Sequence, residues 1–90
     1  MSRLIKCAHI QASNPKHDGT PSEIKKAMID KHIPLIQEAG TKGVNILCLQ
    51  EIFYGPYFCC EQDTKWYATA ETVPGPTTEM LAEYAKKYNM

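Results

Sequence analysis

The stretch that decides the fold is Val44-Asn45-Ile46-Leu47-Cys48-Leu49-Gln50-Glu51, followed by Ile52-Phe53-Tyr54-Gly55-Pro56-Tyr57. An apolar run of strand length bounded by turn residues predicts a strand buried on both faces, as in parallel sheets. In open α/β sheets, functional residues gather where strands end and loops begin. Glu51 stands at such a strand end, where partial burial would suit its carboxylate to accept a proton. The alternative is that Glu51 only marks the exit of the strand into solvent.

The overall composition restricts the class of protein and its partners. The 90 residues carry 10 basic and 10 acidic side chains, so the formal net charge is zero. This balance leaves no excess of positive charge that would attract nucleic acid or anionic lipid. The longest apolar run is far shorter than the roughly 20 residues of a membrane span, and residues 1–6 lack the pattern of a secretory signal. We therefore expect a cytoplasmic protein with no nucleic-acid partner and no membrane association.

The cysteines and histidines predict reduced thiols, no metal and no cofactor. They are Cys7, Cys48, Cys59, Cys60, His9, His17 and His32. The histidines are scattered without ligand spacing, and Cys59-Cys60 lacks the two-residue gap of zinc and thioredoxin-type motifs. Two of the four cysteines lie in strand-like runs, and no export signal favours disulfides. A small redox-responsive thiol protein built on Cys59-Cys60 remains a weaker alternative.

Residues 3–12 predict a first strand, again too apolar for clean alternation and therefore interior. His9 in this strand is expected to be a packed or hydrogen-bonded core residue. A loop over residues 13–21 and a helix over residues 22–39 separate it from the strand that ends at Glu51. Strand, helix and strand at these lengths predict a βαβ unit with parallel strands and a right-handed crossover.

The helix over residues 22–39 is predicted from one apolar stripe at helical spacing. Ser22 is the expected N-cap and Gly40 the expected stop. Pro34 removes the hydrogen bond to the Asp30 carbonyl, which predicts a kink there or two short helices in sequence. The stripe consists of Ile24, Ala27 or Met28, Ile29, His32 or Ile33, Ile36 and Ala39.

The remaining residues predict a long aromatic loop and a second helix. Residues 54–76 form the loop, with one possible helical turn at 63–67, and a loop of this length commonly builds a site or an interface. The alternative is that its aromatic side chains simply roof the sheet. Thr77 or Thr78 is the expected cap of a helix over residues 79–88. Two strands alone cannot bury these elements, so residues 1–90 are predicted to be the incomplete N-terminal segment of a single larger α/β domain.

Several motifs together resemble the nitrilase, or carbon–nitrogen hydrolase, superfamily. They are Leu47-Cys48-Leu49-Gln50-Glu51-Ile52-Phe53 with its flanking Gly43-Val44 and Gly55-Pro56-Tyr57, the strand Ala8-His9-Ile10-Gln11-Ala12, the helix end Glu38-Ala39-Gly40, and Pro74-Gly75-Pro76-Thr77-Thr78. Within the superfamily, the chain is most similar to N-carbamoyl amide hydrolases of the β-ureidopropionase and N-carbamoylputrescine amidase type. The resemblance covers nearly the whole chain, but only the front part of a typical member.

The resemblance implies an α-β-β-α sandwich that associates into homo-oligomers. It also implies a Glu-Lys-Cys triad, in which the thiol attacks the substrate carbon, the carboxylate is the general acid and base, and the lysine stabilises the oxyanion. The matching glutamate is Glu51, whereas the lysine and the cysteine fall beyond this chain. The implied substrate is a small amide, specifically an N-carbamoyl group whose linear C–N bond is cleaved with release of ammonia and carbon dioxide.

Other site residues and rival functions follow from the same pattern. Tyr54 and Tyr57 are candidates to line the substrate pocket, with simple packing as the alternative. Cys60 is disfavoured as a nucleophile, because a thiol also needs a positioned base and an oxyanion site. The 90 residues alone are expected to be inactive. The rival function is a catalytically inactive truncated fragment, or an interaction module that associates through its open sheet edge.

Overall fold

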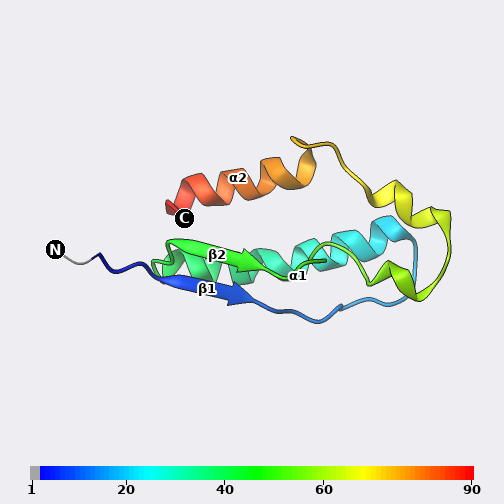
Figure 1. Ribbon diagram of the computed structural model, residues 1–90, viewed down its shortest axis with the longest axis horizontal. Coiled ribbons are helices and arrows are strands. Elements are labelled where there is room, and N and C mark those ends of the chain that lie inside the picture. The colour runs from blue at the N-terminus through cyan, green and yellow to red at the C-terminus, as the bar shows by residue number, and fades with distance from the viewer. Residues whose placement is uncertain (1–2) are drawn as a thin grey trace.

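The structure, a computed structural model, describes residues 3–90 as an α/β arrangement (Figure 1). β1 and β2 form a parallel two-stranded sheet in which Cys7 lies opposite Ile46 and Ile10 opposite Leu49. Both strands point toward the end of the molecule that holds η1 and η2, and both α-helices run back from that end. The predicted α/β class and parallel strand–helix–strand order are confirmed. The elements are β1 (Cys7–Ile10), α1 (Pro21–Thr41), β2 (Ile46–Leu49), the 3-10 helices η1 (Phe58–Cys60) and η2 (Thr64–Thr69), and α2 (Pro76–Tyr88).

The core is built mainly by one face of α1. Its buried residues recur every three or four positions, which places them on a single side of the helix. They confirm most of the predicted stripe and select Met28 over Ala27 and His32 over Ile33. Neither α-helix in residues 3–90 has the length and apolarity that crossing a bilayer requires. The buried residues of α1 are Ile24, Met28, His32, Ile36 and Ala39.

The helices cover only one face of the sheet. The prediction of strands buried on both faces is therefore wrong for the described residues. Burial alternates along each strand, as the two-residue period of a strand requires. Leu47 and Leu49 line a hollow that they share with residues of α1 and α2. Ile46 and His9 lie on the other face and are exposed. His9 is therefore not a core residue, although its Nε2 lies 3.0 Å from Gln11 Oε1.

α1 begins earlier than predicted and is continuous. Thr20, not Ser22, is the N-cap, and its Oγ1 accepts a hydrogen bond from the Glu23 N–H at 3.2 Å. The helix runs without interruption through Pro34, so the alternative of two short helices is wrong. Pro34 and Asp30 are both exposed. Water can therefore reach the Asp30 carbonyl that Pro34 leaves without its helical partner.

α1 ends at Thr41 with Lys42 as its C-cap, so the predicted stop at Gly40 is wrong, and the glycine that follows the helix end is Gly43. Gly43 has a φ of +74°, a left-handed conformation that glycine adopts without steric cost. The Val44 N–H donates to the Ala39 carbonyl and the Gly43 N–H to the Gly40 carbonyl, each at 3.2 Å. This pair of bonds is the Schellman motif, which satisfies the last helical carbonyls.

Gly40 lies inside α1, at a point where the helix packs closely against the end of α2. A Cβ added to Gly40 would overlap the ring of Tyr88. We expect Gly40→Ala to destabilise the protein by about 1–3 kcal/mol through overpacking, although alanine is the better helix former by about 1 kcal/mol. The free energy of urea unfolding tests this. In a Tyr88→Ala background the same substitution should become neutral or favourable, and an unchanged cost there would refute the steric explanation.

α2 begins at Pro76, so the prediction of a start at Glu79 with a threonine cap is wrong. Gly75 occupies the N-cap position, and proline is favoured at the first helical position that follows. Thr78 lies inside the first turn, where its Oγ1 accepts a hydrogen bond from the Gly75 N–H at 2.7 Å. Thr77 is buried in the same turn. Both threonines therefore stabilise the helix start from within the helix.

Candidate active site

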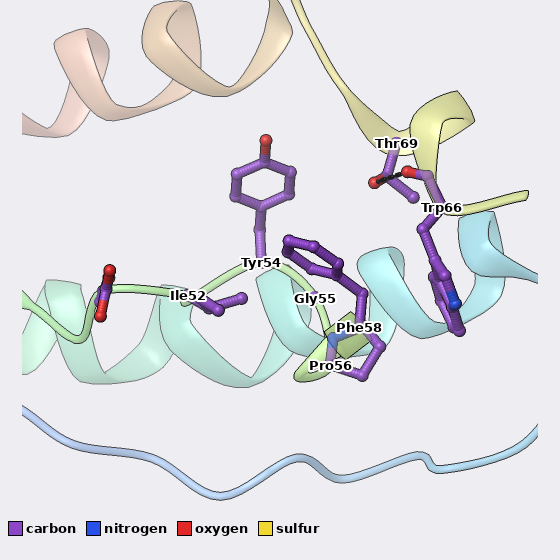
Figure 2. Close-up of a pocket in the computed structure, with 8 residues that line it drawn as sticks. Ile52, Tyr54, Gly55, Pro56, Phe58, Trp66 and Thr69 are labelled. Carbon is purple, nitrogen blue, oxygen red and sulfur yellow. Dashed lines mark hydrogen bonds between the residues drawn. The ribbon is translucent and has the colours of Figure 1, made fainter. Parts of the chain in front are cut away.

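Glu51 lies two residues after the end of β2, at a bend in the chain. It contributes to a pocket of about 200 Å³ that the loop after β2 forms with η2 (Figure 2). Glu51 is exposed, so the expected partial burial of its carboxylate is not observed in this chain. The pocket is lined by Glu51, Ile52, Tyr54, Gly55, Pro56, Phe58, Trp66 and Thr69.

Three aromatic side chains from three segments line this pocket. Tyr54 belongs to the loop after β2, Phe58 is the first residue of η1, and Trp66 approaches from η2 (Figure 2). The Thr69 hydroxyl donates to the Trp66 carbonyl at 2.7 Å, which closes the turn of η2. The indole N–H of Trp66 donates to Glu61 Oε1 at 2.9 Å. The loop after β2 thus contributes side chains to a pocket.

The two tyrosines predicted to bind substrate lie in different hollows. Tyr54 lines the pocket with Trp66. Tyr57 is 66% exposed and lines a neighbouring hollow of about 300 Å³, to which Glu51 and Gln50 also contribute. Glu51 therefore lies at the boundary of both hollows, with one tyrosine on each side.

Phe53 anchors the loop that follows Glu51. Its ring makes edge contacts with His32 of α1 at a centroid distance of 5.5 Å and with Tyr54 at 5.3 Å. His32 is 1% exposed, and its Nδ1 lies 2.7 Å from the Met28 carbonyl oxygen. A carbonyl only accepts hydrogen bonds, so Nδ1 carries the proton. The core face of α1 thereby holds the base of the pocket loop in place.

Lys25 connects α1 to the pocket and to the start of α2. Its ammonium forms an ion pair with Glu71 and donates to the Thr69 carbonyl at 3.1 Å. The same nitrogen lies 4.9 Å from the centroid of the Tyr54 ring, within cation–π range. Glu71 in turn accepts hydrogen bonds from the backbone N–H of Thr77, at 2.7 Å, and from its hydroxyl. We name these four residues, Lys25, Tyr54, Glu71 and Thr77, the Lys25 cluster.

The environment of Glu71 keeps its carboxylate ionised far into the acid range. Its side chain is 12% exposed, and the resulting desolvation raises its pKa. Hydrogen bonds from Lys25 and Thr77 and the charge of Lys25 outweigh this desolvation and lower the pKa to about 2. A negative charge at the start of α2 also interacts favourably with the helix dipole.

Sequence reasoning missed the Lys25 cluster. Its members come from α1, the pocket loop, the segment after η2 and the first turn of α2. A lysine on a helix and a glutamate 46 positions later carry no pattern that predicts a contact. The only local signal in the sequence was that Glu71 lies shortly before Pro76, the first residue of α2. The dipole of a helix stabilises a carboxylate near its N-terminus.

Among the residues that line the pocket, Glu51 supplies the one carboxylate, and none carries a thiol or an amine. Cys59 is a free, exposed cysteine that lines a separate hollow beside η2. The side chain of Cys60, disfavoured above as a nucleophile, lies outside the described residues. Among the side chains that the structure describes, which exclude that of Cys60, no three His, Cys, Asp or Glu gather as metal ligands would. That no metal is used stays a prediction.

Comparison with known proteins places the chain in a class. The family model described as carbon–nitrogen hydrolase matches residues 6–90. The chain therefore belongs to the carbon–nitrogen hydrolase family, and the resemblance drawn from its sequence motifs is confirmed. No solved structure matches it significantly.

Particular relatives of this chain are similar over most of its length. Beta-ureidopropionase of Arabidopsis thaliana is 42% identical over 89 residues, which are 98% of this chain and 22% of that protein. Omega-amidase NIT2-B of Xenopus laevis is 39% identical over 73% of this chain and 22% of its own length. N-carbamoylputrescine amidase of Solanum lycopersicum is 39% identical over 59% of this chain and 18% of its own length. The chain thus spans about a fifth of the length of these curated relatives.

Proposed function

We propose that this chain is the N-terminal part of an amidohydrolase that cleaves a linear amide C–N bond, specifically that of an N-carbamoyl group. The observation that carries the proposal is a carboxylate, Glu51, at the rim of a small aromatic pocket in a carbon–nitrogen hydrolase chain. The beta-ureidopropionase matches 98% of this chain and the omega-amidase 73%, and the broader match supports the choice of an N-carbamoyl substrate over other amides.

Glu51 is proposed as the general acid and base of a Glu-Lys-Cys triad. Glu51 takes the thiol proton as the sulfur attacks the carbamoyl carbon, and it gives that proton to the departing ammonia as the C–N bond breaks, which leaves a thiocarbamate on the cysteine. Glu51 then takes a proton from the water that hydrolyses this intermediate and returns it to the thiol, and the released carbamic acid gives carbon dioxide and the amine. A lysine ammonium balances the oxyanion that develops on the carbamoyl oxygen. The lysine and the cysteine are supplied by parts of the protein outside residues 1–90.

The exposure of Glu51 is consistent with a site that is completed by other parts of the domain. We propose that residues 1–90 are one segment of a single α-β-β-α sandwich domain. The exposed sheet face, with Ile46 at 59% exposure, is the surface against which a second sheet would pack. Association of the complete protein into homo-oligomers belongs to the same proposal.

An ammonia-release assay tests the function directly. The full-length protein from the native gene is incubated with β-ureidopropionate, N-carbamoylputrescine and a simple ω-amide, each over a range of concentrations. The highest kcat/KM is expected for one of the two N-carbamoyl compounds. A preference for the ω-amide would correct the substrate class, and no release from any of the three would refute the proposal. Residues 1–90 alone are expected to release no ammonia.

Tyr54 is proposed to contact the substrate from the pocket wall, and Tyr57 from the neighbouring hollow. Tyr54→Leu in the full-length protein is expected to raise KM by about 3- to 30-fold, because it removes aromatic contact area and the partner of the Lys25 ammonium. Steady-state kinetics measure this. Tyr67→Leu is the matched control, since Tyr67 is 78% exposed and lies outside this pocket. An equal rise in KM for both variants would remove Tyr54 from the binding site.

A second candidate function rests on exposed apolar side chains. Leu4 is 97% exposed, Tyr67 78% and Ile46 59%. Surfaces of this kind and unpaired strand edges commonly bind other chains. An inactive interaction module that associates through its sheet edge is therefore the rival. Inactivity of the full-length protein, together with concentration-dependent association in analytical ultracentrifugation, would favour it.

A further inference from the structure

The side chain of Gln50 bridges the ends of the two strands immediately before Glu51. Gln50 Oε1 accepts a hydrogen bond from the Ala12 N–H at 2.5 Å, and Gln50 Nε2 donates to the Ala12 carbonyl at 2.9 Å. Gln50 Nε2 also makes a longer contact, 3.5 Å, with the carbonyl of Ile52. The amide is partly buried, and its one acceptor oxygen and two donor hydrogens match these three partners in number.

These bonds replace main-chain bonds that a continued sheet would make. The ladder ends with Ile10 opposite Leu49, so Ala12 would next lie opposite Glu51. In a parallel ladder, the N–H and carbonyl of Ala12 would then pair with the main chain on either side of Glu51. The Gln50 amide takes both of these partners instead. The main chain around Glu51 is thereby free to leave the sheet at a bend, where the pocket begins.

We infer that Gln50 is a positioning residue, whose side-chain amide clamps Ala12 and thereby sets where the Glu51 carboxylate lies. The inference rests on the proposed role of Glu51 as general acid and base. The clamp touches the main chain on both sides of Glu51, through Gln50 itself and through the Ile52 carbonyl. Loss of the clamp would let the strand end relax and displace the carboxylate, and displacements of about 1 Å can lower turnover about 100-fold.

The test compares Gln50→Met with the wild-type sequence in the full-length protein. Methionine has a similar length and makes none of the amide hydrogen bonds. We expect kcat to fall by about 10- to 100-fold with KM changed less than about twofold. Hydrogen–deuterium exchange in the peptide containing Ala12 should become about tenfold faster. Gln62→Met, at an exposed position between η1 and η2, is the matched control and should leave both values unchanged.

A double variant shows whether Gln50 acts through Glu51. In a Glu51→Gln background, Gln50→Met is expected to add less than about a twofold loss, because the group that it positions is already absent. A multiplicative loss in this background, or a Gln50→Met variant with kcat within twofold of wild type, would overturn the inference. Wild-type activity of Glu51→Gln alone would instead overturn the proposed function, so the two failures are distinguishable.

If Gln50→Met does not fold, Gln50→Glu provides the same comparison. Glutamate keeps an oxygen that can accept from the Ala12 N–H, but when ionised it cannot donate to the Ala12 carbonyl. We expect a loss in kcat together with faster exchange at Ala12. Wild-type kcat in this variant, with accelerated exchange, would show that the clamp does not position Glu51.

Discussion

Glu51→Gln in the full-length protein is expected to lower kcat by about 10²- to 10⁴-fold, the range in which general acid–base groups contribute. The amide is nearly isosteric with the carboxylate, but it cannot take a proton from a thiol. Since Glu51 is exposed in this chain and makes none of the hydrogen bonds described above, the substitution should leave the folded structure intact. Ammonia release under saturating substrate measures the effect.

Glu83→Gln is the matched control for this prediction. Glu83 is exposed on α2 and lies outside the Glu51 pocket, so the variant should keep wild-type kcat. The melting temperatures of both variants should match that of the wild type, which separates lost chemistry from lost structure. Retention of more than about a tenth of wild-type kcat by Glu51→Gln would contradict the assignment of Glu51.

Lys25→Met is expected to have the largest effect on stability. The substitution leaves the Glu71 carboxylate, with a side chain 12% exposed, without its counter-charge. Removal of one partner from a buried ion pair typically costs 3–5 kcal/mol, and we expect about 2–4 kcal/mol here because Lys25 is 21% exposed. The free energy of urea unfolding of the full-length protein at pH 7 measures this loss.

The neighbouring residue provides a close control for Lys25→Met. Lys26 pairs with Asp30 at the surface, with side chains 76% and 55% exposed. Exposed pairs of this kind contribute about 0–1 kcal/mol, so Lys26→Met should change stability by less than about 1 kcal/mol. If Lys25→Met and Lys26→Met lowered the free energy of unfolding equally, Lys25 would not be part of a partly buried ion pair.

The acid sensitivity of the Lys25 cluster follows from Glu71. Its pKa is about 2 in the folded protein against an ordinary value of 4.5, so the folded state binds protons less readily than the unfolded state. Its contribution, about 3 kcal/mol, is therefore fully present above pH 4.5 and disappears as the pH falls toward 2. Removing Lys25 removes a main cause of the lowered pKa. The difference in unfolding free energy between wild type and Lys25→Met should accordingly shrink between pH 5 and pH 3, and a constant difference would contradict this origin.

Local patterns in the sequence determined the kind and order of the elements. The three- and four-residue spacing of apolar side chains predicted α1 and most of its buried face. The apolar run that ends at Glu51 predicted β2, and the turn residues after it predicted the loop that forms the pocket. The same run, together with the proline- and glycine-rich segment before α2, was specific enough to indicate the family that comparison then confirmed. These signals are local, so a single sequence contains them.

Only the tertiary structure decided the helix ends and the contacts between distant residues. Gly40 looked like a stop signal, but it lies inside the helix, where the ring of Tyr88 leaves no room for a Cβ. Residues 3–90 bury only one face of the strands, since burial depends on what packs against a strand and not only on its apolar side chains. Lys25 contacts Glu71, and Gln50 contacts Ala12, although more than 35 positions separate the two residues of each pair. Such pairs leave no periodic pattern in a single sequence, because long-range hydrogen bonds and ion pairs depend on geometry that arises only when the chain folds.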